Sequence, residues 1–127
     1  MVTVADLMNH NVVSIEPGAS VAEAAARMVR AKVGSAIVLQ GSLLVGILTE
    51  RDVLRVAAFG GDLNSARVSA WMTKDPQSAS PGMSVDEAAR LMMRNGFRHL
   101  PVVEGREIRG VISQRQLFAA RIKRPSG

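Results

Sequence analysis

Residues 8–25 read MNHNVVSIEPGASVAEAA, and residues 72–89 read MTKDPQSASPGMSVDEAA. The two stretches align at an offset of 64 residues, that from Glu23 to Glu87, and the alignment runs without a gap from Met8 to Arg55. The identical pairs include Pro17 and Pro81, Gly18 and Gly82, Ser20 and Ser84, Met28 and Met92, Gly46 and Gly110, and Arg51 and Arg115. So many matches at one fixed offset indicate a tandem duplication.

Each repeat is predicted to fold as a βαββα unit. The first repeat divides into a short extended segment, a helix, two strands and a second helix, at residues 12–15, 20–32, 35–40, 43–48 and 49–58. Ser20 and Glu23, like Ser84 and Glu87 in the second repeat, have the spacing of a capping box at a helix start. The fold class is therefore α/β (α+β), with two halves related by a pseudo-two-fold axis.

The repeat also sets the expected domain limits. We expect a first domain over residues 1–60, a linker over 61–68 and a second domain over 69–127, which ends in a basic tail that carries Arg121, Lys123 and Arg124. The Gly, Asp, Asn and Ser residues before the second repeat are typical of a linker.

Composition excludes several classes of protein. The chain has no cysteine, which rules out disulfides and thiolate chemistry, and no P-loop, His-rich metal cluster or Ser-His-Asp spacing is visible. We therefore expect that it is not an enzyme. No signal peptide or membrane-spanning apolar run is visible either, so a soluble cytoplasmic protein is expected. The net charge of +5 favours anionic partners.

The duplicated pattern resembles the cystathionine-β-synthase (CBS) domain pair, also called a Bateman module. The residues that carry the resemblance are 14–17, 20–24 and 46–52 in the first repeat, and 97–103 and 110–116 in the second. The resemblance implies two clefts between the paired domains that hold an adenosine-containing ligand, namely AMP, ADP, ATP or S-adenosylmethionine. It also implies a homodimer and a regulatory role. Because no effector domain is visible in the chain, we expect a stand-alone module that signals to an effector protein in trans.

Thr49, Arg51 and Asp52 are the principal candidates for nucleotide binding. A predicted strand ends and a helix begins there, so free N–H groups and the positive end of the helix dipole suit a phosphate. The Thr49 hydroxyl can add a hydrogen bond and Arg51 a charge, while the Asp52 carboxylate can accept hydrogen bonds from both ribose hydroxyls. By resemblance Ser14 faces the adenine, and Ile37 and Val38 could line the base slot. The alternative is that Thr49 and Asp52 merely cap the helix.

The second repeat is expected to form a weaker site. Ser113 and Gln116 preserve the capping spacing, but the neutral Gln116 has a single acceptor oxygen and grips a diol less well than a carboxylate. By resemblance Arg98 and His99 could reach ligand phosphates, although both could equally be surface residues at a strand edge. The remaining candidates of this second cleft are Ser78, Pro101 and Arg115.

Two other functions stay open. A nucleic-acid-binding protein fits the sequence pI of about 11.0, although only 3% of the chain is aromatic and few rings are available for base stacking. A ligand-free dimerisation scaffold is the other alternative. An inert response to nucleotides would favour the scaffold, and steeply salt-dependent binding would favour the nucleic-acid reading.

Overall fold

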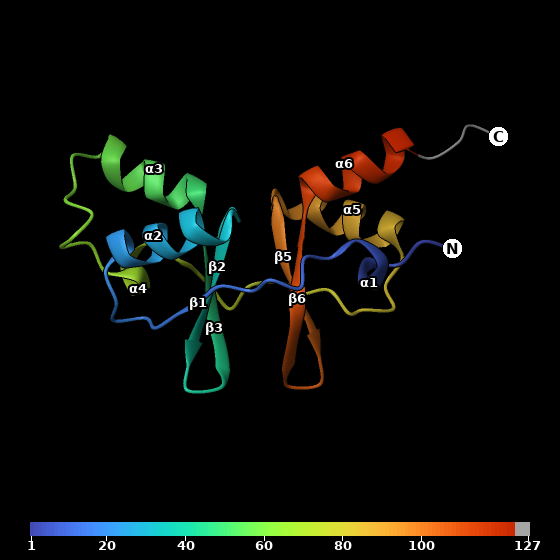
Figure 1. The fold of residues 1–127 in the computed structure, drawn as a ribbon, viewed down its shortest axis with the longest axis horizontal. Coiled ribbons are helices and arrows are strands. Elements are labelled where there is room, and N and C mark those ends of the chain that lie inside the picture. The colour runs from blue at the N-terminus through green and yellow to red at the C-terminus, as the bar shows by residue number, and fades with distance from the viewer. Residues whose placement is uncertain (124–127) are drawn as a thin grey trace. The chain divides into compact units, whose positions relative to one another are not determined.

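The computed structural model describes residues 1–123, so Arg124 of the expected basic tail lies outside the described residues (Figure 1). The chain divides into two compact units. The first-repeat unit comprises Asn11–Pro76. The second-repeat unit comprises Met1–His10 together with the chain from Gln77 onward. No helix in residues 1–123 is long and apolar enough to cross a membrane.

The first-repeat unit is a four-stranded sheet with helices. Its elements are β1 (Ser14–Ile15), α2 (Val21–Ala31), β2 (Ser35–Gln40), β3 (Leu43–Thr49), α3 (Glu50–Ala58), α4 (Val68–Trp71) and β4 (Thr73–Lys74). The strand order is β1-β2-β3-β4, with β1 parallel to β2 and the other pairs antiparallel. The two strands expected over residues 35–40 and 43–48 are confirmed and pair as an antiparallel hairpin, and α2 and α3 lie on one side of it (Figure 1).

The second-repeat unit repeats this plan. It contains α1 (Val4–Leu7), α5 (Val85–Asn95), β5 (His99–Glu104), β6 (Glu107–Ser113) and α6 (Gln114–Lys123). The β5–β6 hairpin carries a parallel bridge from Ala79 to Val102 and an antiparallel bridge from Asn9 to Val111. These single bridges take the places that β1 and β4 occupy in the first-repeat unit.

The segment that begins each repeat packs with the other repeat. Residues 1–10 lead into the first repeat but belong to the second-repeat unit, where the Asn9 N–H donates to Val111 O at 2.8 Å. In the same way, α4 and β4 follow the expected linker but pair with β3 of the first-repeat unit. The compact units therefore do not follow the limits 1–60 and 69–127, which mark the sequence repeat.

A glycine lets each of these segments approach its hairpin. An ideal Cβ added to Gly46 would lie 2.5 Å from Met72 Sδ and 3.0 Å from Thr73 O. One added to Gly110 would lie 2.7 Å from Asn9 O. The two glycines are repeat counterparts, so the same lack of a side chain lets a strand or bridge form at the same place in both units.

The core of the first-repeat unit joins one face of the sheet to the helices. Val21, Ala24 and Met28 fall at helical spacing on α2 and pack in one cluster with Val38 and Leu48 of the hairpin. These side chains are almost completely buried. Small and flexible aliphatic residues fill this core, as the 3% aromatic content requires.

The expected capping box at α2 forms only in part. The Ser20 hydroxyl accepts a hydrogen bond from the Glu23 N–H at 3.1 Å, but the Glu23 carboxylate accepts one from Arg27 at 3.0 Å. Glu23 and Arg27 are four residues apart and therefore share one face of the helix. The Ser84 hydroxyl likewise accepts from the Glu87 N–H at 3.1 Å.

Candidate functional site

Asp52 is the one buried acid among the residues whose side chains are described, with 6% of its surface exposed. It sits one turn into α3, where β3 ends. Its Oδ2 accepts hydrogen bonds from the Thr49 N–H at 2.8 Å and from the Thr49 hydroxyl at 3.1 Å. The Thr49 hydroxyl in turn accepts from the Asp52 N–H at 3.4 Å. The capping box that was the alternative reading of this pair is therefore present.

Asp52 also forms an ion pair with Arg55, a residue that the sequence reasoning missed. Its other oxygen, Oδ1, accepts a hydrogen bond from Arg55 Nη1 at 3.0 Å. The Arg55 guanidinium lies over the Trp71 ring, 5.5 Å from its centroid, and Trp71 stacks on Phe59 with centroids 6.3 Å apart. We call Asp52, Arg55, Trp71 and Phe59 the Arg55 cluster. The signal for its first contact was present in the sequence, since an acid and an arginine three residues apart on a helix face each other.

The start of α3 keeps the features of an anion site, although part of its capacity is used internally. The Glu50 N–H donates to Gly34 O at 3.0 Å, and the Asp52 N–H donates to Thr49. The Arg51 side chain is exposed at the same turn. The Thr49 hydroxyl already donates its one proton to Asp52, so a phosphate bound here would rely on Arg51 and the helix dipole more than on a row of free N–H groups.

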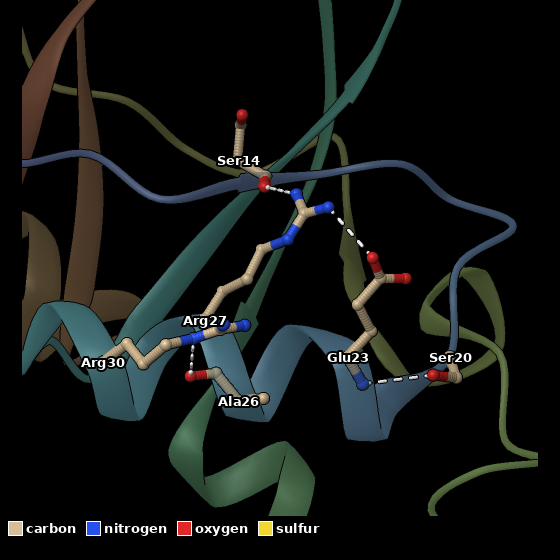
Figure 2. Close-up of polar contacts among 6 residues, drawn as sticks. All are labelled: Ser14, Ser20, Glu23, Ala26, Arg27 and Arg30. Atoms are coloured by element: carbon tan, nitrogen blue, oxygen red, sulfur yellow. Dashed lines mark hydrogen bonds and ion pairs between the residues drawn. The ribbon is translucent and has the colours of Figure 1, made fainter.

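Ser14 lies on the same sheet, at its β1 edge. It pairs with Ile37 of β2, which in turn pairs with Ile47 of β3, two residues before Thr49. The Ser14 carbonyl accepts a hydrogen bond from Arg27 Nη1 at 2.7 Å, and Figure 2 shows its hydroxyl directed away from that guanidinium. Arg27 is held in turn by Glu23 (Figure 2). Sequence reasoning missed Arg27, whose repeat counterpart is Leu91.

The two residues expected to line a base slot point to opposite faces of β2. Val38 packs in the hydrophobic core with Ile15 and Leu48, so its side chain is committed there. Ile37 is also fully buried, and the alternation of side chains along a strand places it on the other face, with Ile47 opposite. Of the two residues, only Ile37 lies on the face of the sheet opposite the hydrophobic core.

The second repeat preserves the cap but not its charge. Gln116 Oε1 accepts hydrogen bonds from the Ser113 N–H at 2.7 Å and from the Ser113 hydroxyl at 3.1 Å. Its amide nitrogen donates to Leu7 O at 3.0 Å, which ties α6 to the segment after α1. The counterpart of Arg55 is Ala119, and that of Trp71 is Leu7. The second-repeat unit therefore has neither the carboxylate nor the cation of the first.

The other candidates of the second repeat are dispersed around β5 and α6. His99 begins β5 opposite Ser113, and Arg98 lies exposed just before it, with its carbonyl accepting from the Gln114 N–H at 2.8 Å. Pro101 is buried in β5, and its carbonyl accepts from the Ala79 N–H at 2.9 Å. Ser78 and Arg115 are exposed.

Comparison with known families decides the identity of the repeat. Residues 4–58 and 68–123 each match the family described as CBS domain. The chain belongs to the CBS domain family. The two matches coincide with the two sequence repeats, so the expected fold class, a tandem CBS pair with mixed α and β structure, is confirmed.

Relatives of known name and structure are similar over most of their length. The CBS domain-containing protein YhcV of Bacillus subtilis is 34% identical over 114 residues, which are 89% of this chain and 81% of YhcV. A hexameric CBS-CP12 protein from bloom-forming cyanobacteria superposes with a TM-score of 0.90 and 32% identity, over 99% of this chain and 72% of that one. A CBS domain protein from Pyrobaculum aerophilum, solved as a complex with AMP, has a TM-score of 0.82 and 28% identity, over 91% of this chain and 89% of that one.

Proposed function

We propose that this CBS pair binds an adenosine-containing nucleotide beside Asp52 and that its role is regulatory. The observation that carries the proposal is the buried Asp52 carboxylate at the start of α3. A helix needs no buried charge to be capped, because Gln116 caps α6 with a neutral amide. A carboxylate that accepts hydrogen bonds and donates none suits a diol that donates two. The AMP complex of the Pyrobaculum aerophilum relative supports the ligand class.

In this proposal the first-repeat unit is the stronger site. Asp52, held in place by Thr49, receives the ribose, Arg51 and the N-terminal end of α3 receive the phosphate, and Ser14 with Ile37 lies at the base. The second-repeat candidates around Gln116 bind less tightly, because the amide offers a diol a single acceptor oxygen. The ligand is AMP, ADP, ATP or S-adenosylmethionine, and its occupancy signals to a protein partner.

Thermal unfolding with each ligand tests the proposal. A ligand at about 100 times its Kd adds about 2.7 kcal/mol to the free energy of unfolding. At about 4 °C per kcal/mol for a chain of this size, the unfolding midpoint should rise by about 10 °C. Asp52→Asn should remove most of this rise, since it removes the charge and one acceptor oxygen. Ser84→Ala is the matched control, because it also removes a helix cap but lies outside both proposed sites, and it should leave the rise intact.

The absence of any ligand-dependent rise in the folded wild-type protein would contradict the proposal. Thr49 and Asp52 would then be a helix cap only, and a scaffold or nucleic-acid-binding role would take its place. Binding of a single-stranded oligonucleotide that weakens steeply with salt would separate these two alternatives.

We also propose that the chain forms a homodimer through its helices. Four exposed apolar side chains occupy two pairs of equivalent positions: Val29 on α2 with Met93 on α5, and Leu54 on α3 with Phe118 on α6. The duplication therefore places exposed apolar side chains at equivalent positions of both repeats, and a two-fold interface between copies would bury the same patch on each copy. Light scattering of Leu54→Glu and Phe118→Glu should show monomers, and an unchanged mass would refute this interface.

A further inference from the structure

We propose that Arg55 competes with ribose for Asp52, and that its release from Asp52 passes ligand occupancy to α4 through Trp71. The inference rests on the proposed function and adds to it a residue that sets affinity and a route for the signal. No motif of the repeat requires Arg55, because its counterpart in the second repeat is Ala119.

The competition follows from the hydrogen bonds that Asp52 already accepts. An ionised carboxylate offers about four lone-pair positions on its two oxygens. Three are taken, two on Oδ2 by Thr49 and one on Oδ1 by Arg55. A ribose diol has two hydroxyl donors, but only one lone-pair position remains on the Asp52 carboxylate. At least one existing partner must therefore leave when a diol binds to both oxygens.

Arg55 is the hydrogen-bond partner whose release from Asp52 costs the least free energy. The Thr49 N–H and hydroxyl both donate to Oδ2 in the partly buried turn from β3 into α3, and the hydroxyl also accepts from the Asp52 N–H, so the loss of either bond would leave a part-buried donor without its acceptor. The Arg55 side chain is 50% exposed and reaches Asp52 through one terminal nitrogen, which water can solvate instead. It also holds Oδ1, the oxygen that Thr49 does not contact.

Arg55 connects Asp52 to another element of the same unit. Its guanidinium lies over Trp71, the last residue of α4, and β4 follows two residues later. β4 pairs with β3 at Gly46 and Ile47, and the chain leaves the first-repeat unit just beyond, after Pro76. Release of the guanidinium removes a cation–π contact from this segment. Ligand occupancy thus acts on the stretch of chain that leads into the second repeat.

Trp71 is the single tryptophan of the chain, so its fluorescence reports on the proposed event directly. AMP is titrated into wild type, Arg55→Ala, Arg55→Gln and Arg30→Ala, with calorimetry and Trp emission recorded in parallel. Arg30→Ala is the charge-matched control, because Arg30 lies on α2 and donates to Ala26 O (Figure 2). 2′-Deoxy-AMP, which lacks one donor of the diol, is the control ligand.

We expect AMP to change the wild-type emission in the same direction as Arg55→Ala changes it without ligand, since both remove the guanidinium from the ring. Arg55→Ala and Arg55→Gln should bind AMP about two- to fivefold more tightly, the range of an exposed ion pair. Their emission should no longer respond to AMP. Arg30→Ala should behave as wild type, and 2′-deoxy-AMP should shift the wild-type emission less.

Equal AMP affinity in wild type and both Arg55 variants, with an emission that AMP does not move, would overturn the inference and leave the proposed function standing. Weaker AMP binding by both Arg55 variants than by Arg30→Ala would also overturn it, because Arg55 would then support the ligand. Calorimetry that detects no AMP, ADP, ATP or S-adenosylmethionine would overturn the proposed function and this inference together.

Discussion

Gly110→Ala tests whether the segment before the first repeat is held by its close approach to β6. The added Cβ would lie 2.7 Å from Asn9 O and 3.0 Å from Met8 Sδ. Asn9 O is a backbone atom and cannot turn away as a side chain can. It also accepts the Val111 N–H at 3.0 Å, while the Asn9 N–H donates to Val111 O at 2.8 Å. The methyl group must therefore displace the segment and stretch both bonds.

The expected cost combines these effects. Overpacking by one methyl group costs about 1–3 kcal/mol. Two weakened backbone hydrogen bonds add about 1 kcal/mol. The lower entropy of the unfolded alanine variant returns about 0.5 kcal/mol. We expect a net loss of about 1.5–3.5 kcal/mol, which at about 4 °C per kcal/mol lowers the unfolding midpoint by about 6–14 °C.

Urea unfolding followed by circular dichroism measures the loss, and hydrogen exchange at the Val111 N–H locates it. Gly82→Ala is the matched control, because no atom lies within 4 Å of an added Cβ there. Gly46→Ala should fall between the two, since its nearest neighbour is the flexible Met72 side chain. A Gly110→Ala variant as stable as Gly82→Ala, with unchanged exchange at Val111, would refute the reasoning.

Two further outcomes are expected. Lys32→Gly should stabilise the protein by about 0.5–1 kcal/mol in urea unfolding, because Lys32 ends α2 in the left-handed region at φ 58°, where Gly96 ends α5 at φ 71°; a loss of stability would contradict this. Arg27→Met should leave global stability within about 0.5 kcal/mol, since its contacts are exposed, but should weaken AMP binding by releasing the Ser14 carbonyl. Arg27→Lys should restore part of the affinity, and equal affinity in all three proteins would show that Arg27 does not position Ser14.

The elements within each repeat could be predicted from the sequence because their signals are local. The Thr49–Asp52 spacing predicted the α3 cap, and the two strands expected over residues 35–40 and 43–48 are β2 and β3. The capping box expected at Ser20 and Glu23 was wrong in one of its two hydrogen bonds, because the Glu23 carboxylate contacts Arg27 instead of the helix start. The reason is also local to the helix, since Arg27 lies four residues on and is the stronger partner for a carboxylate.

The contacts made by the segments between repeats could not be predicted in this way. Alignment of the repeats shows which residues are equivalent, but not which unit a connecting segment packs against. The Arg55 cluster depends on such a segment, because Trp71 reaches Arg55 only when α4 docks on the first-repeat unit. The face on which Val38 lies could not be predicted either, since periodicity alone does not say which face of a buried strand the core uses.

The packing of residues 1–10 with the second repeat matters during synthesis. Ribosomes make chains from the N-terminus, and domains generally fold as units when their residues have emerged. The first-repeat unit is complete once Pro76 is available, but Val4, which is fully buried in the finished protein, must wait for residues 77–123. Val4 thus leaves the ribosome before residues 77–123 but is buried only after they have emerged. A stalled or truncated chain would therefore expose an apolar segment that a quality-control chaperone could recognise.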